Sequence, residues 1–139
     1  ENISRYIDGF VIPLPRARIN DYQRVAEAAA DIWKEHGALE YWECLGDDLN
    51  GEGLRSFSEL AKASEDETVI FAWVVFESRE ARDAANEKIC SDPRMATLVD
   101  PENPIFDPSR MAYGGFKALV VRESQTNSQT NIQPQVAKP

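Results

Sequence analysis

The feature that most constrains the fold is an unbroken run of apolar residues, VIFAWVVF, at positions 69–76. The run is too short to span a membrane and has the length of a strand. Alternate residues of a strand point to opposite faces, so both faces of this strand are apolar and both need cover. Two long helical segments elsewhere in the chain can cover only one face. We therefore predict that a second copy covers the other face, in an obligate homodimer.

Composition favours a single domain and argues against several kinds of partner. The 139 residues can bury a real core, and 24 acidic against 15 basic residues give a net charge of -9. Because a field of this sign repels phosphates and anionic lipids, we expect no nucleic-acid or membrane partner. Cys44 and Cys90 are too few for a disulfide framework and are expected to be buried thiols, which favours a cytoplasmic location.

Four segments have the composition of strands. The first ends where Pro13 and Pro15 remove amide donors, and Gly114 and Gly115 in the last indicate a bulge or the close approach of another backbone. The expected strands are residues 4–14, 39–47, 69–76 and 110–121.

Helical periodicity and capping residues predict helices between these strands. Three helices are expected, and each begins at a capping side chain. Their caps and ends are Asn20 to Gly37, Ser78 to about Cys90, and Asp92, followed by a proline, to Val99.

The remaining segments are connections and a tail. Residues 47–67 form a long connection with one short helix at 58–63, and residues 100–109 form a proline-rich loop. From Glu123 onward the sequence is polar, which predicts a disordered tail in isolation. We expect one domain at residues 1–122 and a polar tail at 123–139.

The order strand, helix, strand, strand, helix, strand predicts an α+β, ferredoxin-like fold, βαββαβ, with a four-stranded antiparallel sheet. In that arrangement the first and third strands lie at the centre of the sheet. They are also the most apolar strands of this chain, so the hydrophobic pattern and the topology agree.

Several motifs resemble those of an uncharacterised bacterial family. They are Y-x-D-G-F at 6–10, W-x-E-H-G-A-L-x-Y-x-E at 33–43, F-x-W at 71–73, D-P-R at 92–94 and R-M-x-x-G-G-F at 110–116. In this order and spacing they make residues 4–122 similar to the YbaA-like family, which resembles the dimeric α/β-barrel superfamily. The resemblance implies a dimer in which two ferredoxin-like sheets face each other, and it implies no particular reaction.

Two polar residues on expected core faces are candidates for catalysis. His36, the single histidine, either caps carbonyls at the end of the first helix or reaches a pocket between helix and sheet and carries a proton. Asp8, inside an apolar strand, is expected to pair with Arg110 or Lys117. The second possibility is that Asp8 is a catalytic acid or base, and the third is that its carboxylate is exposed to solvent.

Aromatic side chains recur in the expected strands, where they favour core or interface packing over a ligand pocket. If a pocket exists, Glu43 is the carboxylate beside it and the third candidate catalytic residue. The candidate ligand contacts are Tyr41, Trp73, Tyr113 and Phe116.

No motif indicates a metal ion or cofactor, and we expect neither. The acidic segment GDDLNGEG at 46–53 departs from the spacing of a calcium loop, and one histidine with two distant cysteines does not make a zinc site. The sequence contains no dinucleotide fingerprint, P-loop or nucleophile elbow.

Our leading hypothesis is a cytoplasmic, cofactor-free homodimer that binds a small apolar molecule in a cleft between helices and sheet. By analogy with the superfamily, its chemistry would be oxygenase-like or isomerase-like. The alternative is a non-catalytic structural or protein-interaction dimer that uses residues 47–67 and the tail as partner surfaces. RNA binding is a third hypothesis, which the resemblance to some relatives suggests. The negative net charge argues against it.

Overall fold

The computed structural model of the chain describes residues 5–124. Four strands form one antiparallel sheet in the order β2-β3-β1-β4. The strands are β1 (Tyr6–Pro15), β2 (Glu40–Leu45), β3 (Glu67–Phe76) and β4 (Ala112–Lys117). The predicted ferredoxin-like fold is confirmed, with β1 and β3 at the centre of the sheet.

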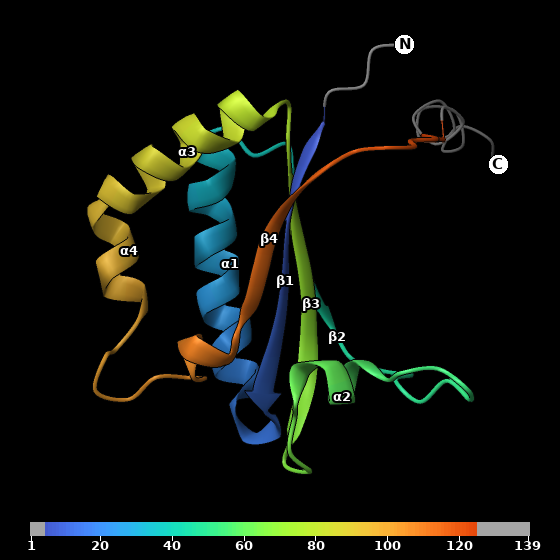
Figure 1. The fold of residues 1–139 in the computed structure, drawn as a ribbon. Helices are drawn as coiled ribbons and strands as arrows, with labels where there is room; N and C mark the ends of the chain where they lie inside the picture. The colour runs from blue at the N-terminus through green and yellow to red at the C-terminus, as the bar shows by residue number, and fades with distance from the viewer. Residues whose placement is uncertain (1–4, 125–139) are drawn as a thin grey trace, which may run out of the picture.

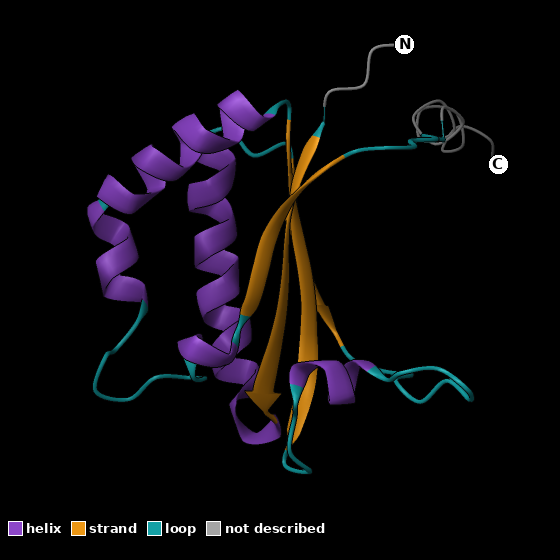
Figure 2. Cartoon of the chain, in the orientation of Figure 1, coloured by secondary structure: helices purple, strands orange, loops and turns teal. Residues whose placement is uncertain are grey.

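Helices lie mainly on one side of this sheet (Figure 1). They are α1 (Ile19–Glu35), α2 (Phe57–Ala61), α3 (Arg79–Ser91) and α4 (Pro93–Leu98), with 3-10 turns η1 (Arg16–Arg18) and η2 (Pro108–Arg110). Figure 2 shows α1, α3 and α4 as one layer against the strands, while α2 lies on the opposite side near one end. Among residues 5–124, no helix is long and apolar enough to cross a membrane.

The core lies between the sheet and α1 and α3. Ile70, Ala72, Val74 and Phe76 of β3 point to this side and are buried, and Phe76 is 0% exposed. Their neighbours on α1 recur at three- and four-residue spacing, as the helical stripe predicts: Tyr22, Ala26, Ala29 and Ile32.

The other face of the sheet carries an open group of aromatic side chains. We call it the aromatic face; it comprises Trp42, Phe57, Phe71, Trp73 and Phe116. The rings of Trp42 and Trp73 stack with their centroids 5.3 Å apart, and Phe71 contacts Trp73 at 5.5 Å and Phe57 of α2 at 5.6 Å. Trp42 remains 50% exposed and Phe71 44%. Within residues 5–124, α2 is the one helix that covers part of this face, so the expectation that the two long helices shelter the other face is confirmed.

Helix ends follow the sequence with one exception. Ser78 accepts a hydrogen bond from Ala81 N, and Asp92 accepts one from Arg94 N, as expected of N-caps. The prediction that Asn20 caps α1 is wrong, because the turn η1 runs directly into the helix and no side chain caps it. Gly37 follows α1 with a φ of 123°, a conformation that favours glycine.

The last strand is shorter than the predicted 110–121. It ends at Lys117, which pairs with Tyr6. Because Tyr6 is the first residue of β1, that strand offers no further residue for β4 to pair with. No bulge occurs at the two glycines, since Gly114 and Gly115 pair regularly with Gly9 and Asp8. The close approach at Gly115 is that of the Tyr6 ring, which a Cβ there would overlap.

The two cysteines differ in environment. Both are free thiols; Cys44 is half-buried, whereas Cys90 is exposed, which contradicts the prediction of two buried thiols. Cys90 lies on α3 at the border of a groove that also includes Ile89 and Met95, which leaves its thiol exposed. The predicted tail is not tested, because residues 125–139 lie outside the described residues.

Phe76→Ala should destabilise the fold strongly. Its side chain is fully buried between the sheet and the helices, so truncation leaves a cavity and should lower the free energy of unfolding by about 3–5 kcal/mol. Urea unfolding measures this change. The control Leu54→Ala, at an exposed position in the 46–56 connection, should change it by less than about 0.5 kcal/mol; equal losses would contradict this packing.

Candidate functional site

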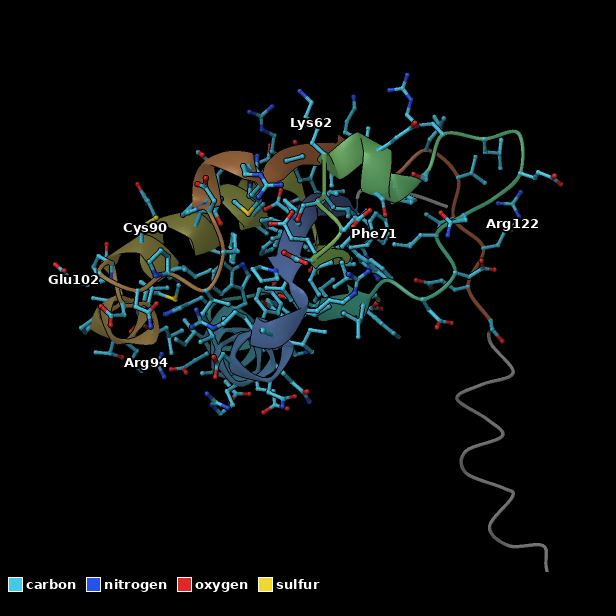
Figure 3. The ribbon with its side chains drawn as sticks, turned by 90° about the horizontal axis from the view of Figure 1, so that it is seen from below. Lys62, Phe71, Cys90, Arg94, Glu102 and Arg122 are labelled. Atoms are coloured by element: carbon cyan, nitrogen blue, oxygen red, sulfur yellow. The ribbon has the colours of Figure 1, made fainter. Side chains whose placement is uncertain are left out.

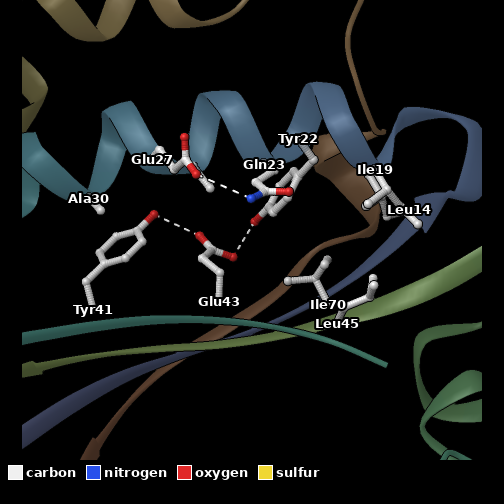
Figure 4. A pocket seen from close by; sticks show the side chains of 11 residues that line it. Leu14, Ile19, Tyr22, Gln23, Glu27, Ala30, Tyr41, Glu43, Leu45 and Ile70 are labelled. Atoms are coloured by element: carbon white, nitrogen blue, oxygen red, sulfur yellow. Dashed lines mark hydrogen bonds between the residues drawn. The ribbon is translucent and has the colours of Figure 1, made fainter. Parts of the chain in front are cut away.

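A pocket of about 330 Å³ lies between α1 and the sheet, next to β2. We call it the Glu43 pocket. Figure 4 shows Glu43 pointing from β2 toward α1, between Tyr22 and Tyr41. Most of its wall is apolar, formed by Leu14, Ile19, Ala26, Ala30, Leu45 and Ile70. This volume falls at the small end of the range for ligand pockets.

Local sequence explains how the pocket forms. Alternation along β2 directs Tyr41, Glu43 and Leu45 to the helix face, opposite Val74, Ala72 and Ile70 of β3. On α1, Tyr22, Ala26 and Ala30 follow one another at four-residue spacing and line the same pocket. The two alanines are small, so space remains between helix and strand where larger side chains would have filled it.

Glu43 is held by two phenols. The hydroxyl of Tyr22 donates to Oε1 at 2.6 Å, and the hydroxyl of Tyr41 donates to Oε2 at 2.8 Å. Each carboxyl oxygen therefore has a partner, and the carboxyl plane is fixed. Tyr41 is steadied in turn by an edge-on contact with Trp33, 6.0 Å between ring centroids.

Burial controls the protonation of this group. It raises the pKa of Glu43 because the ionised carboxyl loses water, while the two tyrosine hydrogen bonds oppose the rise. Burial and the nearby Glu43 also raise the pKa of Tyr22 and Tyr41, so both phenols remain donors at neutral pH. A carboxyl with a raised pKa in an apolar pocket is suited to take up and release a proton.

The charged residues that line the pocket are acidic. They are Glu43 inside and Glu27, whose Oε2 accepts a hydrogen bond from Gln23 at 3.3 Å. Within residues 5–124, no Lys, Arg or His lines it. The pocket therefore disfavours anionic ligands and suits uncharged, largely apolar ones.

Asp8 belongs to a second cluster on the same side of the sheet. The prediction of Arg110 or Lys117 as its partner is wrong: Arg82 of α3 donates to Asp8, and also to the Tyr113 hydroxyl at 2.8 Å. Arg110 is engaged instead by Glu67. Burial raises the pKa of Asp8, and the charge of Arg82 opposes that rise. The cluster borders a groove of about 500 Å³ that also includes Trp33.

His36 lies away from both cavities. Its Nε2 is 2.9 Å from Oδ2 of Asp92, the residue that caps α4. Arg94 and His36 together lower the pKa of Asp92. This contact fastens the end of α1 to the start of α4, and it agrees with a structural position near the helix terminus more closely than with a proton carrier in the Glu43 pocket.

The structure thus separates the candidate residues into groups. Glu43 and Tyr41 meet in one pocket, and Asp8 and Tyr113 meet at Arg82. Trp73 and Phe116 lie on the aromatic face, away from the Glu43 pocket. Within residues 5–124, no three His, Cys, Asp or Glu side chains gather as a metal site.

Sequence reasoning missed two polar partners. Tyr22 is a buried residue of α1, and only the packing of this helix against β2 shows that its hydroxyl reaches Glu43. Arg82 is a buried charge on the same stripe of α3 as Ala85 and Ile89. Its partner Asp8 is 74 residues away in sequence, so only the tertiary fold brings them together.

Sequence comparison assigns a family. The family described as "Protein of unknown function (DUF1428)" matches residues 5–108. The uncharacterized protein YbaA of Escherichia coli is 41% identical over 116 residues, which cover 84% of this chain and 97% of YbaA. This chain belongs to the DUF1428 family. The resemblance to YbaA-like proteins inferred from the motifs is confirmed.

Several solved structures share the fold. A NIPSNAP family protein of unknown function from Agrobacterium tumefaciens has a TM-score of 0.54 at 15% identity, covering 85% of this DUF1428 chain and 91% of its own. SnoaB, a cofactor-independent oxygenase from Streptomyces nogalater, has a TM-score of 0.52 at 10% identity, and the match covers 88% of this chain and 97% of SnoaB. A dimeric ferredoxin-like protein from an uncultured marine organism has a TM-score of 0.50 at 11% identity, and the match covers 86% of this chain and 98% of that protein. Such identities show a shared fold and carry no activity.

Glu43→Gln should change how stability depends on pH. The folded pKa of Glu43 is raised above its ordinary value of 4.5, so the folded chain holds this proton more tightly than the unfolded chain. The resulting stabilisation is present below pH 4.5 and is lost as the pH rises through the folded pKa. In urea unfolding at several pH values, the free energy of unfolding of the parent should therefore fall relative to that of Glu43→Gln as the pH rises.

The control is Glu27→Gln, which removes an exposed carboxylate from the same pocket. It should keep the pH profile of the parent. Parallel profiles for the parent and Glu43→Gln would contradict the raised pKa.

Proposed function

We propose that this protein binds a small, uncharged, largely apolar molecule in the Glu43 pocket and that Glu43 transfers a proton to or from it. The observation that carries the proposal is the half-buried carboxyl held between two tyrosines, with no cation among the described residues that line the pocket. A structural carboxylate is usually paired with a cation, as Asp8 is with Arg82. Glu43 has only phenol donors, which leave it able to change protonation state.

The reaction class that suits this arrangement is proton abstraction beside a carbonyl. Glu43 takes the proton from carbon, and the electron pair of the broken C–H bond moves onto the carbonyl oxygen as an enolate. Return of the proton to another carbon completes an isomerisation. Reaction of the enolate with dioxygen is the oxygenase-like alternative. The structural likeness to the cofactor-independent oxygenase SnoaB supports this chemistry by analogy of fold alone.

Glu43→Gln should abolish proton exchange. The parent is incubated in deuterium oxide with a panel of neutral enolisable ketones, and nuclear magnetic resonance follows loss of the α-proton signal. The variant should be slower by roughly 10²–10⁴-fold, the usual contribution of a general base. Glu87→Gln, at an exposed position of α3 outside the Glu43 pocket, should match the parent. No exchange above the buffer rate for any ketone would leave the non-catalytic dimer as the better account.

We further propose a homodimer that forms through the aromatic face, in a cytoplasmic protein whose thiols stay reduced. Large apolar patches that remain exposed on one chain mark interaction sites. The stacked Trp42 and Trp73 with Phe71 form such a patch at the centre of the sheet. The dimeric ferredoxin-like protein of similar fold supports a dimer by analogy of fold alone. A non-catalytic structural dimer is the second candidate function, and the same patch supports it.

Phe71→Asp should weaken the dimer. The new carboxylate would be buried without a partner, which should raise the dimer dissociation constant at least about tenfold, or roughly 1.4 kcal/mol. Sedimentation velocity over a concentration series measures the constant. Val99→Asp places the same charge on an exposed loop after α4 and should leave it unchanged. A parent protein that stays monomeric at every concentration would exclude this dimer.

A further inference from the structure

The connection between β2 and α2 carries an Asn-Gly pair in open surroundings. Residues 46–50 have no regular secondary structure, and residues 50–55 are all exposed. Figure 1 shows this connection projecting beyond α2, on the side of the sheet away from α1, α3 and α4. Seen from below, it extends outward on the side of Arg122 and away from Cys90 and Arg94 (Figure 3). The side chain of Asn50 is therefore accessible to water.

Gly51, the next residue, has a backbone nitrogen that is free to react. Within residues 5–124, the N–H of Gly51 makes no hydrogen bond with the protein, whereas its carbonyl accepts one from Leu54 N at 3.4 Å. Glycine also places no side chain beside this nitrogen. A Cβ built at Gly51 would lie 3.3 Å from Cδ1 of Leu54, so a larger residue here would crowd the connection.

We infer that Asn50 is a site of spontaneous deamidation, at which the side-chain amide becomes a carboxylate. The backbone nitrogen of Gly51 attacks the side-chain carbonyl carbon of Asn50 and forms a new C–N bond. The proton of the Gly51 amide passes to the departing nitrogen, which leaves as ammonia. The two residues are then joined in a cyclic imide. This site lies outside the Glu43 pocket, so it is independent of the proposed function.

Water opens the imide ring in one of two ways. Attack at the former side-chain carbonyl restores the normal main chain and gives aspartate. Attack at the main-chain carbonyl of Asn50 gives isoaspartate, in which the main chain passes through the former side chain. Either route breaks a C–N bond of the ring, returns a proton to the Gly51 nitrogen and leaves a carboxylate. Water is the sole co-reactant, and nothing is oxidised or reduced.

The other asparagines among residues 5–124 are protected by their surroundings. Asn20 lies in α1 and Asn86 in α3, where the helical backbone keeps the following amide nitrogen away from the side-chain carbonyl. Asn103 is exposed but precedes Pro104, whose nitrogen carries no hydrogen and cannot attack. Exposure, an irregular backbone and a following glycine therefore coincide at Asn50.

The modification should leave the fold intact, because the connection is anchored on both sides of Asn50. Before it, Gly46 N donates a hydrogen bond to the carbonyl of Val69 in β3 at 2.8 Å. After it, Ser56 Oγ accepts one from Glu59 N at 3.0 Å and caps α2. Isoaspartate lengthens the main chain between these two anchors, in a segment that belongs to neither strand nor helix.

The new carboxylate adds negative charge where the chain is already acidic. Asp47, Asp48 and Glu52 lie in the same connection and are exposed. Deamidation of a single asparagine makes the net charge of -9 more negative by one unit. The modified protein can therefore be separated from the parent by charge.

Incubation of the full chain provides the first test. The purified protein is held at neutral pH for several weeks, and anion-exchange chromatography follows the acidic form. Peptide mapping by mass spectrometry should locate the modification at Asn50, and an isoaspartyl methyltransferase should label the same peptide. Asn20, Asn86 and Asn103 should remain amides. Absence of an acidic form, or an acidic form in which Asn50 is intact, would overturn the inference.

Two variants and a control isolate the chemical step. Asn50→Gln should abolish the modification of this peptide, because the longer side chain closes a ring far more slowly. Gly51→Ala should slow the reaction at least about tenfold, since a Cβ beside the attacking nitrogen hinders its approach. The control Asn103→Gln should match the parent. Equal rates for the parent and Gly51→Ala would contradict attack by this nitrogen.

A comparison with the unfolded chain tests the role of the structure. In guanidinium chloride, Asn50 should react within about tenfold of its rate in the folded protein, because the folded connection imposes little restraint on the attack. A folded rate that is slower by more than this margin would show that the connection holds Gly51 away from the side chain of Asn50. The site would then be protected in the native protein, and the inference would be wrong.

Discussion

The structure depends on the burial of β3 from two sides. This strand pairs along both edges, with β1 and β2, and is apolar on both faces. On the helix side, residues of α1 and α3 pack over Val74 and Phe76. This packing stabilises the fold, because burial of apolar surface contributes about 25 cal/mol per Å². Among residues 5–124, the opposite side is covered by α2 at one end. The aromatic face and the free edge of β2 follow from this imbalance, because both lie where the described part of the chain supplies little cover.

The Glu43 pocket departs from the packing that surrounds it. Elsewhere on the helix side apolar residues fill the space between α1 and the sheet, but here alanines face a carboxyl and two phenols. A half-buried carboxyl that has hydrogen bonds but no cation loses part of its hydration, and leucine at the same position would pack without that cost. Proteins depart from local packing rules chiefly at functional sites. That cost makes Glu43 a stronger functional candidate than Asp8, whose charge Arg82 neutralises.

Periodicity predicted the fold well, because it reports which face of each element is buried. It predicted β3, the stripe of α1 and the caps Ser78 and Asp92, all of which depend on neighbours in sequence. Periodicity failed to predict features that depend on contacts between residues far apart in the sequence. The end of β4 depends on where β1 begins, and the partner of Asp8 depends on how α3 crosses the sheet. In the candidate site, Glu43 and Tyr41 could be named from alternation along β2, whereas the hydroxyl of Tyr22 comes from a different element.

The position of β2 matters for the proposed function. An edge strand exposes unpaired backbone groups, which invite uncontrolled association unless something covers them. β2 also carries Glu43, so a segment that covered its edge would also limit the access of water to the pocket.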